Sequence, residues 1–338
     1  MTGTVIITGA TGSLALEAVQ QLLSSHPSLT IVGTVRNASQ NPKSSYLLQL
    51  EDLAPQYLGS KLVLKSADLN SLTEVRSFAD DVASQVASGE LPAISAIICN
   101  AFTWSLEDGL RFSRDDYEST FQVNHLAHFL LVMKLLSSMD RERGRVVLLG
   151  SGVHDPELQN PLSKLGAHLP DADEDLDQLV KPGPDPAGTE HDMGWRRYAT
   201  SKLANVMFMH SLNQQLERNP SLRNITVTTM DPGALVSSRA HAVQRPLAKS
   251  LFGVVKLLLP VLKLFTYQFR SNADSARDLT ALAVDPKYHS VRGYFTGQKQ
   301  IPSAPMSQDK EKMKALWLAC WKWTSLEETE TCLSKQVS

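Results

Sequence analysis

The sequence predicts a doubly wound α/β domain, in which parallel strands form one sheet and helices cover both of its faces. Short runs rich in β-branched residues alternate along the chain with longer segments of helical period, such as 16–23. Apolar runs separated by helices are typical of buried parallel strands. The runs with this character are 4–8, 30–35, 61–65, 93–99, 145–150 and 224–230. We therefore expect a single domain over 1–338, with a sheet of about seven strands.

The composition indicates a globular protein with a large core and no affinity for nucleic acid. The 338 residues are 42% hydrophobic, which is ample for a substantial core. With 33 basic and 35 acidic residues the net charge is −2, so no positive field would recruit nucleic acid. We expect a small-molecule partner instead.

The cysteines and the first residues indicate a reducing, cytoplasmic location. The sequence has three cysteines, Cys99, Cys320 and Cys332, too few and too scattered for a disulfide framework or a zinc site. The first strand begins almost at once, without the basic and long apolar regions of a secretory signal. His125 and His128 lack an acidic partner at metal-ligand spacing, so we expect them to make structural contacts. No bound metal ion is predicted.

A glycine-containing loop joins the first strand to the first helix. Its sequence is TGATGSLA, from Thr8 to Ala15. Gly9 permits a tight turn, Gly12 lets the backbone approach a pyrophosphate at the helix N-terminus, and Ala15 keeps the helix close to the sheet. The pattern predicts a dinucleotide site, with an ordinary glycine-rich turn as the alternative.

The residues after the second strand bear on the choice of dinucleotide. That strand ends at Val35 and is followed by Arg36 and Asn37. NAD-specific folds usually carry an acidic residue here, which binds the ribose 2′-hydroxyl and would repel a 2′-phosphate. A guanidinium can bind that phosphate through two hydrogen bonds. We therefore predict NADP(H) as the cofactor, with a solvated loop arginine as the alternative.

Further motifs, in the expected order, resemble those of the short-chain dehydrogenase/reductase family. They are ADL at 67–69, CNAF at 99–102, NHLAHFLL at 124–131 and DPGALVS at 231–237. The third resembles the branch that includes retinol dehydrogenases and light-dependent protochlorophyllide reductases. The resemblance covers about 2–300 and implies a Rossmann-type domain.

The resemblance also implies a set of cofactor-binding residues. Asp68 and Leu69 would contact the adenine, and the Pro-Gly loop would flank the nicotinamide. Phe102 stands where the family has a glycine, so the backbone there must be accommodated differently. The full set is Thr8, Gly9, Thr11, Gly12, Ser13, Leu14, Arg36, Asn37, Asp68, Leu69, Asn100, Ala101, Phe102, Tyr198, Lys202, Pro232, Gly233, Leu235 and Ser237.

The stretch YATSK places Tyr198 and Lys202 one helical turn apart on the same face. A free phenol has a pKa near ~10, and a nearby ammonium should lower that pKa into the range of acid–base catalysis. The spacing alone is common on helices, so the context decides. The resemblance implies that Ser151 orients a substrate carbonyl, and that Asn124 helps to hold a water that leads protons to the lysine.

These residues predict an NADP(H)-dependent carbonyl reductase or alcohol dehydrogenase, for which secondary metabolism is the hypothesis. Tyr198 would donate a proton to the carbonyl oxygen as hydride reaches the carbonyl carbon. Two non-redox alternatives stay open, a cofactor-sensing scaffold and a cyclase or isomerase that uses the same pocket. The intact set of Asn124, Ser151, Tyr198 and Lys202 argues against a sensor, because sensors typically lose the tyrosine.

Aromatic residues near the motif ends predict the class of substrate. Trp104, His154 and Trp195 would join Ser151 and Tyr198 around an apolar pocket for a lipophilic, aromatic or polycyclic compound. Each aromatic residue could equally belong to the core. Protochlorophyllide reduction itself is not favoured, because those enzymes carry a cysteine-rich pocket that three cysteines cannot reproduce.

The gap between the serine and the tyrosine is longer than in the family. Residues 155–192 fill it with six prolines and ten acidic against two basic residues, which predicts an irregular, solvated excursion. We assign 152–194 as an insertion near the active site. Its favoured role is a substrate-side flap or a partner surface, with a decorative loop as the alternative.

An apolar segment at 237–270 follows the Pro-Gly loop, where the family usually places its lid. Its part 247–270 reads as a helix that Pro260 interrupts. The basic residues that recur there every seven positions are Lys249, Lys256, Lys263 and Arg270. Lid or core packing is favoured, with a monotopic membrane surface or a subunit contact as alternatives.

Two further helices are expected at the C-terminal end, at 271–284 and within 307–325. The second, with its periodic residues at 308–323, carries Trp317, Trp321 and Trp323. The family often forms homodimers through helices like those containing Asn124 and Tyr198. A homodimer is therefore a prediction, although the tryptophan-bearing helix could block or replace that contact.

Overall fold

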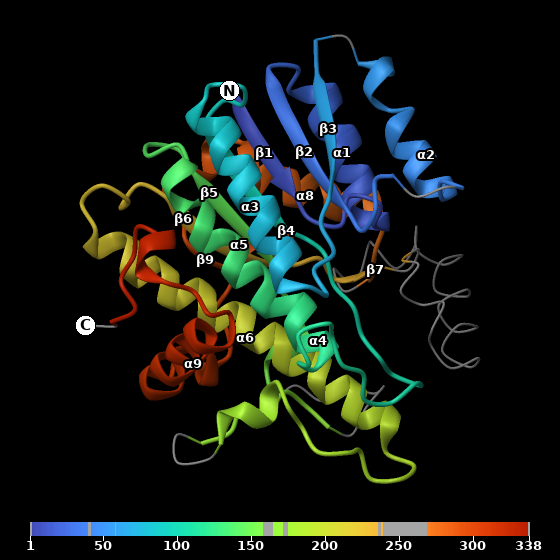
Figure 1. Ribbon diagram of the computed structural model, residues 1–338, viewed down its shortest axis with the longest axis vertical. Helices are drawn as coiled ribbons and strands as arrows, with labels where there is room; N and C mark the ends of the chain where they lie inside the picture. Colours follow the sequence, from blue (N-terminus) through green and yellow to red (C-terminus); the bar gives the residue numbers. More distant parts are fainter. Residues whose placement is uncertain are drawn as a thin grey trace.

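The computed structural model describes residues 2–39, 42–57, 59–157, 165–171, 175–235, 238 and 269–336. Within these residues an eight-stranded sheet has helices on both faces (Figure 1). Its strand order is β10-β9-β6-β5-β4-β1-β2-β3, and all neighbours are parallel except β10 and β9. The predicted doubly wound α/β fold is confirmed.

All predicted strands are present, and each lies within two residues of its expected bounds. The sheet strands are β1 (Gly3–Ile7), β2 (Leu29–Val35), β3 (Lys61–Ser66), β4 (Ile94–Cys99), β5 (Arg145–Leu149), β6 (Thr226–Asp231), β9 (Gly293–Thr296) and β10 (Lys299–Gln300). A separate short pair joins β7 (Ala234–Leu235) to β8 (Phe269–Arg270). The sequence did not predict β9, because four residues beside glycines carry little periodicity.

The helices also follow the sequence pattern, including those expected at 16–23, 271–284 and 308–323. They are α1 (Ser13–Ser25), α2 (Ser45–Glu51), α3 (Leu72–Ala87), α4 (Ser119–Phe121), α5 (Ala127–Leu135), α6 (Glu190–Arg218), α8 (Asn272–Val284) and α9 (Lys310–Trp323). A π-helical turn, Gln122–Leu126, separates α4 from α5 and carries Asn124.

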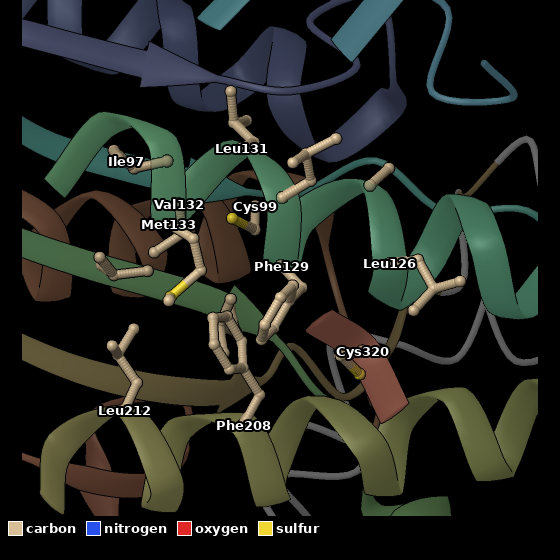
Figure 2. Packing of buried hydrophobic residues seen from close by; sticks show 14 of the residues in the cluster. Ile97, Cys99, Leu126, Phe129, Leu131, Val132, Met133, Phe208, Leu212 and Cys320 are labelled. Carbon is tan, nitrogen blue, oxygen red and sulfur yellow. The ribbon is translucent and has the colours of Figure 1, made fainter. Parts of the chain in front are cut away.

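Alternation along the strands divides the core into two clusters, one on each face of the sheet. On β1, Val5 and Ile7 pack with residues of α1 and α8, whereas Ile6 packs with residues of α3, α5 and α6. Figure 2 shows the second cluster, where the rings of Phe129 and Phe208 lie 5.1 Å apart between α5 and α6. Cys99 is buried in this cluster and packs as a small core residue.

The C-terminal helix α9 packs against α6 (Figure 1). Trp317, Trp321 and Trp323 are all buried, and the Trp317 ring lies 5.5 Å from that of Phe129. The helix therefore adds a third layer outside α5 and α6, where the family often forms dimers. The homodimer stays a prediction.

The described part of the insertion contacts the C-terminal helix and α6 through its acidic side chains. Asp177 accepts a hydrogen bond of 2.7 Å from the indole N–H of Trp323, and Lys312 pairs with Asp171 at 2.6 Å. Arg197 of α6 pairs with Asp185, also at 2.6 Å. The Asp171 side chain is still 72% exposed, so these residues stay solvated, as expected, while they also contact α9 and α6. Residues 190–194 are moreover the first turn of α6.

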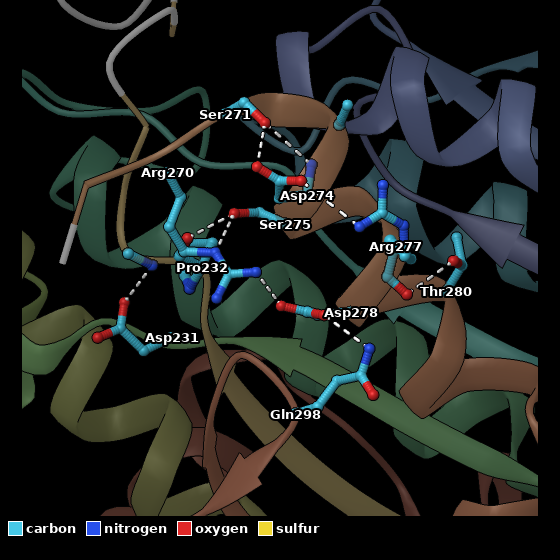
Figure 3. A network of polar contacts seen from close by, with 12 residues as sticks. Asp231, Pro232, Arg270, Ser271, Asp274, Ser275, Arg277, Asp278, Thr280 and Gln298 are labelled. Atoms are coloured by element: carbon cyan, nitrogen blue, oxygen red, sulfur yellow. Dashed lines mark hydrogen bonds and ion pairs between the residues drawn. The ribbon is translucent and has the colours of Figure 1, made fainter. Parts of the chain in front are cut away.

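Most of the predicted lid segment, and with it Lys249, Lys256, Pro260 and Lys263, lies outside the described residues. Arg270 is described and does not belong to an exposed basic stripe. It lies in strand β8, forms an ion pair with Asp278 of α8 and donates a 3.1 Å hydrogen bond to the Ser275 hydroxyl (Figure 3). The Ser275 hydroxyl donates in turn to the Pro232 carbonyl at 2.7 Å, so this network anchors the Pro-Gly loop.

Candidate active site

A cleft of about 1130 Å³ runs along the C-terminal ends of the parallel strands. The loops that follow β1 to β6 contribute to its walls, as the C-terminal edge of a doubly wound sheet requires. Most of the predicted cofactor residues line it. They are Gly9, Thr11, Gly12, Ser13, Leu14, Arg36, Asn37, Asp68, Leu69, Asn100, Ala101, Phe102, Tyr198, Lys202, Pro232, Gly233 and Leu235.

Two predicted cofactor residues differ from this set. Ser237 lies outside the described residues. Thr8 is buried behind the cleft, where its hydroxyl oxygen accepts hydrogen bonds from the backbone N–H groups of Asn100 and Ala101 at 2.9 and 3.0 Å. The same oxygen lies 2.9 Å from Nε2 of His128. Thr8 therefore ties the phosphate loop to the end of β4 instead of facing the cleft.

The loop between β1 and α1 has the shape that a dinucleotide phosphate needs. Gly9 has φ +64°, and a Cβ there would lie 3.0 Å from Cβ of Ala101, so both conformation and space require glycine. Gly12 is the N-cap of α1 and lines the cleft together with Ser13 and Leu14, so the N-terminus of the helix lies at the cleft. Arg36 is exposed on the cleft wall and has no hydrogen-bond or ion-pair partner among the described residues. These residues fit a phosphorylated dinucleotide.

Tyr198, Ser151 and Lys202 meet at the inner end of the cleft. Ser151 follows β5 and lines the cleft, and its side chain interacts with the Tyr198 hydroxyl in the direction that lowers the pKa of the phenol. Lys202 lies one turn along α6, with its ammonium 5.6 Å from the centre of the Tyr198 ring. That ammonium donates a 2.9 Å hydrogen bond to the Leu149 carbonyl, at the end of β5. The predicted catalytic group is thus assembled at the expected place.

Burial dominates the electrostatics of this group. Burial raises the pKa of Tyr198 above its ordinary value, and the nearby Asp231 carboxylate adds to the rise. Burial also lowers the pKa of Lys202 to about 7, which Asp231 partly opposes. Lys202 is not among the groups that shift the pKa of Tyr198 here, so the predicted effect of the lysine stays a prediction. The buried lysine is a weak source of charge and is bound to a carbonyl, so the cost of burying a phenolate dominates.

Asn124, the fourth predicted catalytic residue, is fully buried next to α6 and does not itself line the cleft. Its side-chain oxygen accepts from Thr103 N at 2.7 Å, and its amide nitrogen donates to Thr103 O at 3.0 Å and to Ser201 Oγ at 2.9 Å. Its backbone carbonyl accepts from Asn205 Nδ2 at 3.2 Å and from His128 Nδ1 at 3.0 Å. The two lone pairs of that carbonyl are therefore engaged by side chains. The role of Asn124 in holding a water stays a prediction.

Three aromatic residues, Phe102, Trp104 and Trp195, form what we call the aromatic wall beside Tyr198. The Tyr198 ring centre lies 5.1 Å from that of Trp104, 5.8 Å from Trp195 and 6.0 Å from Phe102. Phe102 is 40% exposed, and its ring also faces the Lys202 ammonium at 5.5 Å. All three line the cleft, which places the predicted substrate residues Trp104 and Trp195 beside the ring of Tyr198.

His154, the remaining predicted substrate residue, does not line the cleft. Its Nδ1 donates to the Ser151 carbonyl at 2.8 Å, and its Nε2 accepts from Ala304 N at 3.0 Å. Both ring nitrogens are thus committed to backbone groups, and burial lowers the pKa of the imidazole. His154 fixes the turn that carries Ser151.

Sequence reasoning missed several residues of the cleft, of which Asp231 is the most important. Its carboxylate accepts from the backbone N–H groups of Gly152 and Gly233, both at 2.9 Å, and so joins the loops after β5 and β6. Its place in the DPG motif was the signal. Arg111 and Phe112 also line the cleft, but their loop carries no motif that could have revealed them.

Of the described residues of the insertion, Gly152 and Val153, next to Ser151, line the cleft, whereas 165–171 and 175–194 do not, so the flap interpretation gains no support from the latter. His125 and His128 make structural contacts, as predicted. No group of three His, Cys, Asp or Glu residues suited to a metal ion occurs in the described part of the chain. Nor does any helix in that part have the length and apolar character needed to span a membrane.

A parallel sheet with a glycine loop after its first strand and a Ser–Tyr–Lys group at its C-terminal edge defines an α/β oxidoreductase site. The short chain dehydrogenase family model matches residues 3–159, and the AcuH dehydrogenase domain model matches 238–333. The short-chain dehydrogenase iccH of Talaromyces variabilis is 31% identical over 98% of both chains. The chain belongs to the short-chain dehydrogenase/reductase family.

Other relatives include the branches expected from the motifs. Mouse retinol dehydrogenase 14 is 26% identical over 93% of this chain and 83% of its own. The chloroplastic protochlorophyllide reductase of Chlamydomonas reinhardtii is 28% identical over 93% and 76%.

Solved structures share the fold at lower identity. An uncharacterised protein of Mycobacterium paratuberculosis aligns with TM-score 0.64 and 21% identity over 96% of this chain and 94% of its own. A Burkholderia cenocepacia short chain dehydrogenase in complex with NADP aligns with TM-score 0.57 and 19% identity over 87% and 95%.

Proposed function

We propose that the protein is an NADP(H)-dependent carbonyl reductase or alcohol dehydrogenase for a lipophilic, aromatic or polycyclic substrate. The observation that carries this proposal is the position of Tyr198, which lies with Ser151 and Lys202 in the cleft between the phosphate loop and the aromatic wall. Bound nicotinamide would supply or accept the hydride. Membership of the family supports the reaction class, and the NADP complex of the Burkholderia relative supports the choice of cofactor.

The chain's own residues perform the proton chemistry in this proposal. The raised pKa keeps Tyr198 protonated near neutral pH, which suits a proton donor to a substrate carbonyl oxygen. Ser151 donates a hydrogen bond to the same oxygen and so orients it beside the phenol. Lys202 holds the ribose hydroxyls, and Arg36, exposed on the opposite wall, binds the 2′-phosphate.

The aromatic wall supports the proposed substrate class. Flat rings pack well against Trp104 and Trp195, and an apolar wall excludes water from the carbonyl during proton transfer. Phe102 covers the side toward Lys202, where a glycine would leave the wall open. A planar substrate could therefore reach Tyr198 along this face.

The test follows NADPH oxidation by absorbance with a panel of aromatic ketones, quinones and steroids, and repeats it with NADH. We expect turnover with at least one compound and a preference for NADPH. A Trp104→Leu variant should raise KM for aromatic compounds more than for small aliphatic ketones. If NADPH binds and no compound in the panel is reduced, the non-redox alternative replaces this proposal.

A further inference from the structure

The hydrogen-bond partner of Lys202 is itself held by another side chain. The Leu149 carbonyl accepts from Lys202 Nζ at 2.9 Å and from Asn205 Nδ2 at 3.3 Å. Asn205 lies on α6, almost one turn beyond the lysine, and is 1% exposed. Both lone pairs of this carbonyl are therefore engaged in a region closed to solvent.

The orientation of the Asn205 amide follows from its neighbours. Its nitrogen faces the carbonyl oxygens of Leu149 and Asn124, which can only accept hydrogen bonds. Its oxygen must then accept from Nδ1 of His125, at 3.0 Å. The Nε2 of that imidazole is left as an acceptor for the thiol of Cys320, at 3.2 Å. The hydrogen bonds thus form one chain in which each group donates to the next, from Cys320 of α9 to the carbonyls beside Lys202.

The Asn205 amide also binds the Asn124 carbonyl. That carbonyl accepts from Asn205 and from His128, and all three side chains are buried. We propose that Asn205 is a positioning residue, which holds the Leu149 carbonyl against Lys202 and links it to the Asn124 carbonyl. The bound end of the Lys202 side chain is thereby fixed by protein groups. The inference rests on the proposed function, because Lys202 has a catalytic task only there.

Several titratable groups face Lys202 from the elements around it. Tyr198 lies on its own helix, Asp231 at the end of β6, and His128 on α5. His125 lies beyond Asn205. Of these groups His125 loses a hydrogen bond when Asn205 is shortened, and it lies beyond the amide. Tyr198, Asp231 and His128 keep their side chains, so a change in the titration of Lys202 would report on the loss of the amide.

The test measures the titration of Lys202 in the full-length protein without any nucleotide or substrate. Competitive labelling with a small amine-reactive reagent across pH 5–10, followed by mass spectrometry, gives the midpoint for this lysine. In Asn205→Ala we expect the midpoint to rise by about one pH unit or more, because water enters the vacated space and solvates the ammonium. Asn205→Ser opens the same space with a smaller change and should move the midpoint in the same direction.

Asn213 provides a matched control on the same helix. It is also buried, and its amide makes two backbone hydrogen bonds with Val227, at 2.8 and 3.0 Å. Asn213→Ala should lower the thermal stability and leave the Lys202 midpoint where it is. An unchanged midpoint in the folded Asn205 variants, or an equal shift in Asn213→Ala, would overturn the inference. Failure of the proposed function would appear separately, as absent turnover with this labelling result intact.

Discussion

At the phosphate end of the cleft the backbone provides most of the shape, whereas at the catalytic end buried side chains do. Gly9 and Gly12 form the phosphate loop through their conformation and lack of a Cβ. Lys202, Asn205 and Asp231, by contrast, are each held through a bond to a main-chain group that is distant in sequence. The comparison teaches that a site shaped by backbone conformation can be recognised from a local sequence motif. A site shaped by buried side chains depends instead on the whole fold.

Thr8 and His128 connect the two ends. The Thr8 oxygen accepts two backbone hydrogen bonds, so its hydroxyl proton is directed at Nε2 of His128. Nδ1 of that ring then donates to the Asn124 carbonyl. A change at either end can therefore reach the other through one neutral imidazole.

The largest effect is expected from Tyr198→Phe, which removes the proposed proton donor and leaves the phosphate end of the cleft unchanged. Loss of the proton donor should lower kcat by roughly 10³-fold. The aromatic contact with Trp104 survives, so the melting temperature and the affinity for NADPH should stay close to those of the native protein. Steady-state kinetics measure kcat, and a fluorescence titration measures the affinity for NADPH. Tyr288→Phe, which removes a phenol bound to Gln298, is the control and should keep full activity.

The second largest effect is expected from low pH, which should lower the stability of the protein through two buried histidines beside Lys202 and Asn205. Burial lowers the pKa of His125 and of His128 from 6.5 to about 4. Between pH 6.5 and pH 4 the two histidines are protonated in the unfolded chain but not in the folded protein. The free energy of unfolding therefore has its full value above pH 6.5 and decreases as the pH falls toward 4. Each histidine should contribute a loss on the order of 3 kcal/mol in the free energy of unfolding.

Urea unfolding at a series of pH values measures this loss. His128→Gln should make the free energy of unfolding fall less steeply between pH 6.5 and 4, because one of the two proton uptakes disappears. The same change at the exposed His289 should leave the slope as it is. Identical slopes for His128→Gln and the native protein would mean that the buried imidazole does not carry the effect.

Arg36→Glu tests the one predicted side-chain contribution at the phosphate end of the cleft, where the backbone provides most of the shape. The carboxylate would repel a 2′-phosphate, so the affinity for NADPH should fall roughly 30-fold, or about 2 kcal/mol, while NADH binding stays similar. Titration with each nucleotide measures the ratio. Arg277→Glu, an exposed change on α8, should leave the ratio as it is. An equal loss for both nucleotides would argue against recognition of the 2′-phosphate.

The smallest effect is expected from Gly9→Ala. The positive φ and the close approach to Ala101 should cost about 1–2 kcal/mol of stability and weaken nucleotide binding. Gly89 has φ +79° with open space around it, so Gly89→Ala isolates the conformational cost. Chemical denaturation should show a larger loss for Gly9→Ala, and only that variant should bind nucleotide more weakly. If the two variants lost the same stability and bound nucleotide equally well, the close approach of Gly9 to Ala101 would not explain the requirement for glycine.

The sequence predicted those parts of the molecule whose causes are local. The strands from β1 to β6 appear as short apolar runs, and the phosphate loop appears as two glycines between a strand and a helix. The Tyr198 and Lys202 pair follows from helical spacing, and the family motifs placed Ser151 beside it. Each of these features rests on backbone geometry within a few residues, or on motif order along the chain.

The tertiary structure decided what depends on burial and on partners far apart in the chain. Asp177 binds Trp323 across 146 positions, so no local pattern could show that the insertion packs on α9. The rise in the pKa of Tyr198, the lowered pKa of Lys202 and the role of Asn205 all come from the exclusion of water. Periodicity places a side chain on one face of a helix, but only packing sets its distance from solvent and from other charges, and these distances fix its chemistry.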